Sequence, residues 1–201
     1  EKFPDPIKAV DGKYIQIHKI NGQKFICRML SFLEGEMLGN TKNTKKMFES
    51  LGIFLAKMDK KLQSYNNNII KSRVWHWDLQ YFHLNKKFID YISDAKDRSL
   101  VKNLFYQFDE NVRPLIPYLR KSIIHSDANE WNVLIQNGKV CSIIDFGDLV
   151  YSPLINEIAI AMTYASYDKD NPLDWASIIL KSYNDEIPIL EIEIKILYYL
   201  I

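Results

Sequence analysis

Apolar residues recur with two different spacings along the chain, and a change of spacing indicates where a strand is followed by a helix. Between 13 and 33, two runs rich in β-branched and aromatic residues flank Asn21-Gly22, the dipeptide that most strongly favours a two-residue hairpin turn. From 41 to 62 the apolar positions follow helical spacing instead. We therefore expect a β-hairpin and then a helix that Gly52 weakens only slightly.

The second half repeats this order. Residues 94–112 predict a helix that the prolines just after it terminate. Residues 123–145 predict a second hairpin, and a helix is expected to open at Ser152-Pro153, with the serine as cap, and to run to about 165. Further helices are expected over 174–183 and from 189. This order indicates the α+β class, with the first hairpin in a separate small sheet.

Composition narrows the class of protein further. The 201 residues are 47% hydrophobic and 25% charged, with a formal net charge of +1, an ordinary globular profile that gives no reason to expect nucleic acid or a membrane as partner. Two distant cysteines suggest no disulfide framework and favour a reducing, cytoplasmic location. The chain starts without Met and ends in an uncapped apolar pattern, so we expect a piece of a longer protein.

The second hairpin carries oxygen-bearing side chains that suit a metal. If its strands pair symmetrically around the turn, Asn132 faces Ile143 and shares a face with Asp145. Amide and carboxylate oxygens suit Mg²⁺, which fills its other positions with water and phosphate. Asp127, in the loop that enters the hairpin, can face the same space and accept or orient a hydroxyl proton. One acid and two Mg²⁺ ligands form the arrangement of phosphoryl transfer.

Two short motifs match the kinase template for this chemistry. "HSDANEWN" at 125–132 corresponds to H-R-D-x-x-x-x-N, and "DFG" at 145–147 is the metal-binding triplet that follows it. Either motif alone is common in ordinary turns. Their occurrence together, in order and on one hairpin, favours a catalytic loop, in which we interpret His125 as a hydrogen-bonding brace.

The stretch "IIHSDANEWNVLI…IDFGDLVYSPLINEIAIAM" resembles the aminoglycoside phosphotransferase/choline kinase-like superfamily. It is most similar to the hydroxylysine kinase branch, which includes kinase-like domains fused to class III aminotransferases. The resemblance implies a protein-kinase-like two-lobed fold. Residues 1–35 would be the end of the small β lobe with the hinge, and 36–201 would be most of the helical C-lobe, with its catalytic hairpin at 123–147.

The resemblance also implies roles for single residues. Asp127 would be the catalytic base, Asn132 and Asp145 would bind Mg²⁺, and the backbone near Ser31, Phe32 and Leu33 would contact the base of ATP or GTP. A glycine-rich loop and a strand lysine would precede Glu1, because the 201 residues contain neither in a convincing context. The fragment alone is therefore expected to be inactive.

The acceptor is expected to be a small molecule. No A-P-E triplet follows the D-F-G, and the segment before the next predicted helix is too short to present a peptide. Trp77 and Asp78 could line an amine pocket, although packing of the tryptophans in the helical lobe is the favoured alternative, since large aromatic side chains are mostly buried. Asp148 could assist the metal or face the substrate, and a solvated loop acid is the alternative.

Three functions are compatible with these residues. The first is transfer of a nucleotide γ-phosphate to a hydroxyl of a small amine-containing molecule. The second is a pseudokinase or regulatory nucleotide-binding domain, possibly associated with another enzyme domain. The third is a metal-dependent hydrolase that uses His125, Asp127, Asp145 and Asp148, which is weak because only one of the four histidines lies near the acids.

Overall fold

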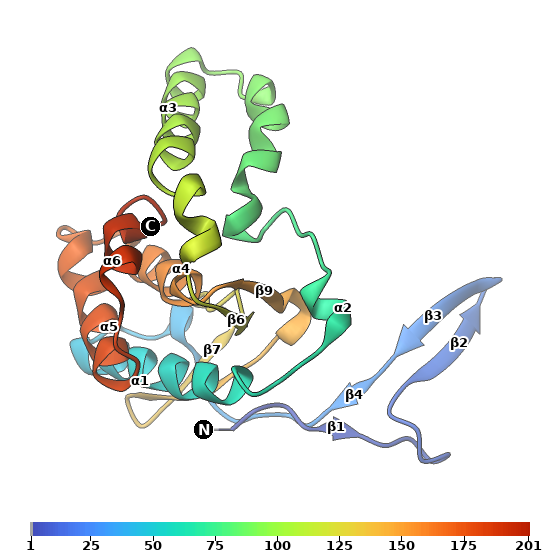
Figure 1. Ribbon diagram of the computed structural model, residues 1–201. Helices are drawn as coiled ribbons and strands as arrows, with labels where there is room; N and C mark the ends of the chain where they lie inside the picture. Colours follow the sequence, from blue (N-terminus) through green and yellow to red (C-terminus); the bar gives the residue numbers. More distant parts are fainter. Residues whose placement is uncertain (1) are drawn as a thin grey trace.

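Three helices and one hairpin form the core of the molecule (Figure 1). In the computed structural model, which describes residues 2–201, α1 (Lys45–Leu62) packs against α5 (Pro172–Glu186), and α5 packs against α4 (Ile155–Ser166). The strand β8 (Lys139–Ile143) lies against α1 and pairs with β7 (Val133–Gln136). Apolar side chains of all these elements belong to one continuous buried cluster, which holds the hairpin in place.

A glycine sets the distance between α1 and α5. A Cβ atom on Gly52 would lie 2.1 Å from Ser182 Oγ and 2.5 Å from the carbonyl oxygen of Ile179. Since real Cβ atoms do not approach other atoms so closely, the two helices can pack at this distance only with glycine here. Gly52, expected to be a slight weakness of its helix, is a requirement for packing.

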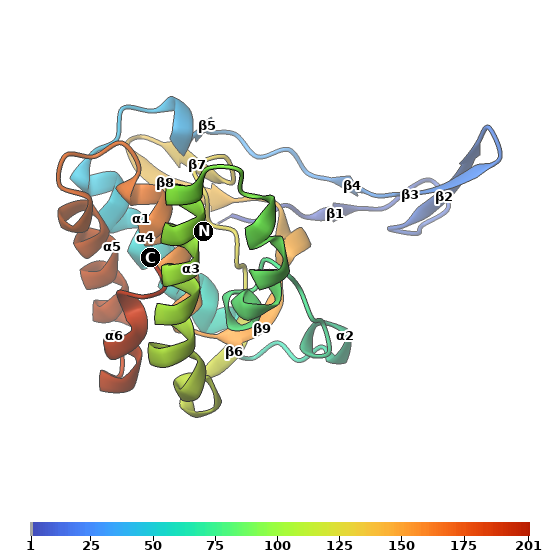
Figure 2. The same ribbon diagram turned by 90° about the horizontal axis from the view of Figure 1, so that it is seen from above.

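Within residues 2–201 the strands form four small sheets. β5 (Glu36–Met37) joins β7 and β8, and β6 (Lys121–Ile124) pairs with β9 (Val150–Pro153). β1 (Pro6–Ile7) pairs with β4 (Met29–Leu30). β2 (Gln16–Ile20) and β3 (Gln23–Cys27) pair only with each other among the described residues, and their hairpin projects away from the helices in both ribbon views (Figures 1 and 2).

The remaining helical segments connect these parts. They are η1 (Leu38–Asn40), α2 (Asn68–Lys71), the kinked η2 (Leu79–Tyr91), α3 (Ala95–Asn111), η3 (Arg113–Tyr118), η4 (Phe146–Asp148) and α6 (Glu191–Leu197). The ring of Phe82 on η2 stacks on Phe105 of α3 with 4.2 Å between centroids, which ties these two segments together. No helix within 2–201 combines the length and the apolar character that crossing a membrane requires.

The expected α+β class and both Asn-Gly hairpins are confirmed, as are the helices expected over 94–112 and 174–183 within a few residues. The helix expected to open at Ser152-Pro153 was wrong in its start. Both residues belong to β9, where Ser152 pairs with Ser122 and Pro153 with Lys121, and the helix begins at Ile155. Pairing with the distant strand β6, which local sequence does not encode, overrides the capping pattern.

The expected register of the second hairpin was correct only next to the turn. Gln136 pairs with Lys139 and Ile135 with Val140, but Leu134 then pairs with Ser142 and Val133 with Ile143. Cys141 is thus the extra residue of a β-bulge, which shifts the pairing by one position. Asn132 therefore lies opposite Ile144, whose amide donates to the Asn132 carbonyl at 2.9 Å, and not opposite Ile143, so strand pairing does not place Asp145 on the same face as Asn132 as expected.

Candidate functional site

The loop between β6 and β7 holds Asp127 in a fixed orientation. Its carboxylate accepts a hydrogen bond from the amide of Asn129 at 2.8 Å and one from the amide of Asn132 at 2.6 Å. The Asn132 amide also donates to the Asp127 carbonyl at 2.9 Å. Because Asn132 lies at the start of the buried β7, these bonds fix the loop carboxylate against the core of the molecule.

A buried carboxylate binds the backbone of the two loop residues that precede Asp127. Glu157, at the start of α4, has no exposed surface, and its Oε2 accepts from the backbone amides of His125 at 2.6 Å and Ser126 at 3.1 Å. Ser126 has a φ of 67°, a strained conformation for a non-glycine residue that persists only where its surroundings impose it. Burial raises the pKa of Glu157 to about 7.

His125 links this loop to the strand that precedes the D-F-G triplet. Its Nδ1 accepts from the amide of Asp127 at 3.3 Å, so Nε2 carries the proton and donates to the carbonyl of Ile144 at 3.0 Å. Burial lowers the pKa of the imidazole, although nearby carboxylates, including those of Asp127 and Asp145, oppose this effect. With both nitrogens engaged, His125 has the contacts of a brace and is unsuited to ligate a metal as the hydrolase hypothesis requires.

The D-F-G segment forms a tight turn. Asp145 has a φ of 62°, and its Oδ1 accepts from the amide of Gly147 at 3.1 Å. Arg73 clamps the far side of the turn, since its guanidinium donates to the carbonyls of Gly147 at 2.7 Å and Leu149 at 3.1 Å. The same guanidinium lies 3.8 Å from Asp148, a long and partly exposed ion pair that leaves most of this carboxylate's charge available to a ligand.

One cavity lies directly in front of Asp127. This acceptor cavity has a volume of about 460 Å³ and is lined by Asp127, Asp148 and Trp77 together with Thr163 and Tyr164 of α4 and Tyr167, the residue that follows α4. Trp77 is 75% exposed, so its ring forms part of the cavity wall. The structure therefore brings Trp77 and Asp148 to the same cavity as Asp127.

Asp78 does not line this cavity. It is 1% exposed, and its carboxylate accepts from Ser152 Oγ at 2.6 Å and from the Gln80 side-chain amide at 2.6 Å. Burial raises the pKa of Asp78, an effect that these hydrogen bonds partly offset. The substrate contact expected of Asp78 is thus wrong, because the side chain cross-links η2 to β9. Trp75 packs on the core as the alternative expectation for the tryptophans had it, whereas Trp77 is exposed at the cavity.

Asn132 and Asp145 retain oxygens that suit Mg²⁺. Since the nitrogen of the Asn132 amide makes both of its bonds to Asp127, the Oδ1 atom points elsewhere. Asp145 uses Oδ1 for its turn, which leaves Oδ2. Mg²⁺ uses few protein ligands and completes its octahedron with water and phosphate, so one available oxygen on each of these two side chains is the kind of donor set that it takes. The residues present therefore fit this ion.

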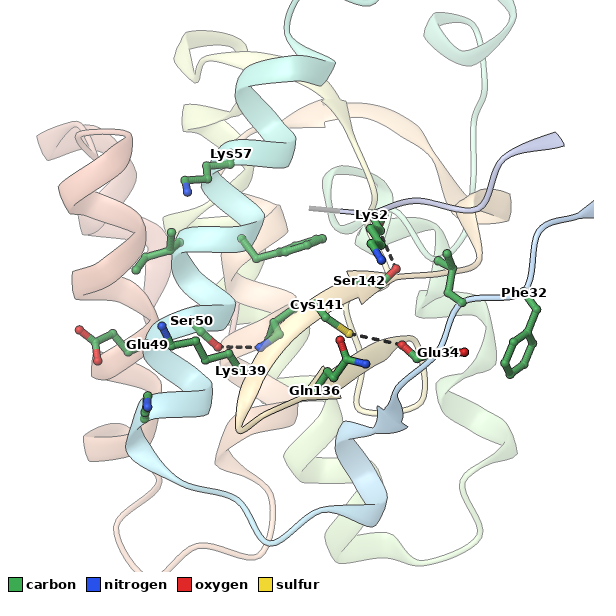
Figure 3. A pocket seen from close by; sticks show the side chains of 15 residues that line it. Lys2, Phe32, Glu34, Glu49, Ser50, Lys57, Gln136, Lys139, Cys141 and Ser142 are labelled. Carbon is green, nitrogen blue, oxygen red and sulfur yellow. Dashed lines mark hydrogen bonds between the residues drawn. The ribbon is translucent and has the colours of Figure 1, made fainter.

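The residues expected to contact the nucleotide base lie at a different cavity. A cavity of about 920 Å³ is lined by Phe32 and Leu33 together with side chains of α1, β7 and β8; Figure 3 shows this cavity, with Ser50 of α1, Gln136 of β7 and Lys139 of β8 among the residues that line it. Asp127, Asn132 and Asp145 do not line it. Ser31 is already engaged, because its amide donates to the Asp5 carbonyl at 2.8 Å and its Oγ accepts from the Asp5 amide at 2.9 Å.

Sequence reasoning missed the contribution of α4 to the acceptor cavity. The ring centroids of Tyr164 and Tyr167 lie 5.5 Å apart. In the sequence the two tyrosines stand at the end of a predicted helix and carry no sign of a function. Burial raises the pKa of Tyr164, and the Asp127 carboxylate adds to this effect. Tyr164 lies in the last turn of α4 and Tyr167 directly follows the helix, and only the tertiary packing of this helix end shows that both border the site.

Comparison with known proteins places this geometry in context. The model of the family described as "Phosphotransferase enzyme family" matches residues 12–190. Hydroxylysine kinase of Mus musculus is 26% identical over 93% of this chain and 53% of its own length, and hydroxylysine kinase of Xenopus laevis is 24% identical over 98% of this chain and 57% of its own length. The chain thus spans about half the length of the curated relatives it matches.

Solved structures share the fold. A microcompartment-associated aminopropanol kinase superposes with a TM-score of 0.75 at 15% identity, covering 98% of this chain and 63% of its own. The GDP complex of an aminoglycoside 2'-phosphotransferase superposes with a TM-score of 0.64 at 16% identity, and the match covers 99% of this chain and 65% of that protein's chain. The AMP-bound complex of spectinomycin phosphotransferase superposes with a TM-score of 0.60 at 18% identity, and the match covers 98% of this chain and 65% of that protein's chain. At such identities the likeness concerns the fold, and it confirms the expected kinase-like architecture.

Proposed function

Because the chain belongs to the phosphotransferase enzyme family, we propose that its protein transfers the γ-phosphate of a nucleotide to a hydroxyl of a small amine-containing molecule. The observation that carries the proposal is the position of Asp127. Its carboxylate is fixed by two amides and lines a cavity that also contains the carboxylate of Asp148. The relatives named as hydroxylysine kinases and the aminopropanol kinase fold neighbour support an acceptor with both an amine and a hydroxyl.

Asp127 is the residue that acts on the acceptor. A hydroxyl bound in the acceptor cavity would donate its hydrogen to this carboxylate, which orients the oxygen toward the phosphate and accepts the proton. Phosphoryl transfer has a loose transition state, so placement in line contributes more than covalent help from the protein. Asn129 and Asn132 hold the carboxylate, and His125 and Glu157 hold the backbone on which it stands.

Asn132 and Asp145 are the residues that would hold Mg²⁺. When bound, the ion neutralises the charge of the nucleotide phosphates. The Asn132 amide thus has two tasks, because its nitrogen orients Asp127 while its oxygen is directed elsewhere. This arrangement couples the position of the proposed base to that of the proposed metal ligand.

The segment at residues 32–33 is the part of the hinge that we propose for contact with the ATP or GTP base. Ser31 is better assigned to holding that segment on Asp5. AMP and GDP complexes among the fold neighbours support a nucleotide donor without choosing its base. We keep the lobe boundary at residue 35 as part of the proposal, since the β2–β3 hairpin projects away from the helical body (Figure 1).

Two further features of the proposal concern the setting of the protein. Cys27 and Cys141 are both free thiols, which supports a reducing, cytoplasmic compartment. An association with a further enzyme domain is compatible with relatives about twice as long as this chain.

The proposal is tested with the full-length protein that contains this chain. We expect Mg²⁺-dependent conversion of an amino alcohol to its phosphate ester with ATP or GTP, detected by mass spectrometry, and loss of at least about a hundredfold in rate for Asp127→Asn. The matched control is Asp90→Asn, since Asp90 has a side chain that is 90% exposed and remote from the acceptor cavity. Nucleotide binding without any transfer would instead favour a pseudokinase, and an unchanged rate for Asp127→Asn would exclude Asp127 as the base.

A further inference from the structure

The turn that carries the proposed metal ligand Asp145 has little support of its own. It consists of the three-residue η4, and short 3-10 segments of this kind have poor hydrogen-bond geometry. Asp145 and Gly147 are exposed, and Asp145 adopts a left-handed φ of 62°. Phe146 anchors one side of the turn, since its ring centroid lies 4.8 Å from that of His125. The other side depends on contacts from a different segment.

Arg73 supplies those contacts. Its Nη1 group donates to the carbonyls of Gly147 at 2.7 Å and Leu149 at 3.1 Å. One charged nitrogen therefore binds the backbone on both sides of Asp148, and charged donors make stronger hydrogen bonds than neutral ones. The amide of Gly147 is held as well, because it donates to Asp145 Oδ1 at 3.1 Å. Both peptide groups of Gly147 are thus fixed, one by the proposed metal ligand and the other by Arg73.

The guanidinium of Arg73 is itself held in place. Its Cζ atom lies 4.3 Å from the centroid of the Trp75 ring, and Trp75 packs on the core. Two residues before Arg73, Lys71 Nζ lies 5.3 Å from the ring centroid of Tyr151 on β9. Cation–π contacts of this kind restrict long side chains that are otherwise rich in rotamers. Contacts on both sides of Arg73 in the chain thus fix the segment 71–75 beside the turn.

Arg73 acts far less directly on the acceptor cavity. It is not one of the residues of 2–201 that line this cavity. Its Nη2 atom lies 3.8 Å from Asp148 Oδ1, and both side chains are partly exposed. Because an exposed ion pair contributes little free energy, loss of the guanidinium should change the backbone of the turn more than the charge of the cavity.

The following inference rests on the proposed function, because it concerns the same metal site. We propose that Arg73 is a positioning residue for Mg²⁺. It fixes the carbonyls of Gly147 and Leu149, and through this turn it sets the direction in which Asp145 Oδ2 points. Residues that hold a metal ligand in this way change the affinity for the metal by about 10–100-fold when they are lost. Arg73 thus acts through the affinity for the Mg²⁺–nucleotide complex and not through contact with the acceptor.

Nucleotide binding with and without the metal tests the proposal. The full-length protein is titrated calorimetrically with ATP, or with GTP where the native protein prefers it, in excess Mg²⁺ and again in EDTA. Arg73→Met keeps an apolar side chain over Trp75 but removes the donors. We expect its affinity for the Mg²⁺–nucleotide complex to fall about tenfold, while its affinity for the metal-free nucleotide stays at the native value. Arg73→Lys restores a charged donor without the planar fork and should recover part of the loss.

Kinetics and a control variant complete the test. The Mg²⁺ concentration for half-maximal phosphotransfer should rise about tenfold in Arg73→Met, while KM for the amino alcohol remains close to the native value. Arg98→Met is the matched control, since Arg98 of α3 also donates to a backbone carbonyl, that of Ile92 at 2.7 Å, and does not line the acceptor cavity. It should leave both binding affinities and both kinetic quantities unchanged.

The outcomes separate this inference from the proposed function. Native affinities in Arg73→Met, or an equal loss with and without Mg²⁺, would overturn the inference and leave the proposed function standing. A larger rise in KM for the amino alcohol than in the Mg²⁺ requirement would also contradict it. Absence of Mg²⁺-dependent transfer by the native protein would overturn both.

Discussion

The carboxylate of Glu157 supports the strongest prediction about stability and activity together. It is fully buried, and it is the acceptor for two backbone amides of the catalytic loop. Glu157→Ala leaves both amides buried without that partner. Since an unsatisfied buried donor costs about 1–3 kcal/mol, the variant should lose about 2–6 kcal/mol of its free energy of unfolding, a large part of the 5–15 kcal/mol typical of a domain.

Glu157→Gln separates the hydrogen bonds from the charge. The glutamine carbonyl can still accept from His125 and Ser126, so we expect a far smaller loss of stability and a kcat near that of the native protein. In Glu157→Ala the backbone two residues before Asp127 is released, and a small displacement of a reacting group can cost about a hundredfold in rate. Urea unfolding and the phosphotransfer assay, applied to both variants, measure the two effects separately.

The same pair of variants predicts a dependence on pH. The pKa of Glu157 is raised from 4.5 to about 7 by burial, so the folded state binds a proton that the unfolded chain has already released between these values. The unfolding free energy should therefore decrease as pH rises from 4.5 through 7, by up to a few kcal/mol at about 1.4 kcal/mol per pKa unit. Glu157→Gln lacks this ionisation and should show a flatter profile across the same window.

Asp59 contributes to this profile and must be considered with Glu157. Burial raises its pKa, and the neighbouring charge of Glu157 raises it further. The Asp59 carboxylate accepts from the hydroxyl of Tyr183 at 2.6 Å, while its Oδ1, like Oε1 of Glu157, has no hydrogen-bond partner within 2–201. Profiles of the same slope for Glu157→Gln and the native protein would refute the reasoning, as would full stability and activity in Glu157→Ala.

Three other changes test separate parts of the molecule. Gly52→Ala should lower the free energy of unfolding by about 1–3 kcal/mol, the usual cost of overpacking, because the new Cβ would meet Ser182 Oγ at 2.1 Å; unaltered urea unfolding would contradict this. Arg120→Met should cost about 3 kcal/mol, since it leaves the buried Glu193 without the guanidinium that binds it at 2.6 and 2.9 Å; a thermal melt measures the loss. Asp145→Asn should raise the Mg²⁺ concentration needed for half-maximal phosphotransfer by about tenfold or more, and an unaltered requirement would exclude Asp145 as a ligand.

The parts of the fold that the sequence predicts are those with local causes. Asn21-Gly22 and Asn137-Gly138 adopt the turns expected of them, with positive φ at all four residues, because the preference lies within the dipeptide. Asp94 caps α3 through bonds to the amides of Lys96 and Asp97, again a local interaction.

Features that depend on distant segments could not be predicted in this way. The bulge at Cys141 has no local turn signal, and Ser152-Pro153 carries a helix-start pattern that pairing with β6 overrides. Asp78 and Asp148 look equally suitable for an amine in the sequence, but only packing shows that Ser152 and Gln80 consume the carboxylate of Asp78. The motif fixes which side chains are candidates, and the tertiary contacts decide which of them face the cavity.

The two strained residues of the site explain why it needs so many supporting contacts. Ser126 and Asp145 both have positive φ angles, of 67° and 62°, and such conformations cost about 1–3 kcal/mol each unless neighbours impose them. Glu157 fixes the first through two amides, while the Asp145 side chain fixes the second through Gly147. His125 then joins the two strained segments, since one nitrogen meets the Asp127 amide and the other the Ile144 carbonyl. The proposed base and the proposed metal ligand are therefore held relative to each other by one imidazole, so that a change at His125 should disturb both at once.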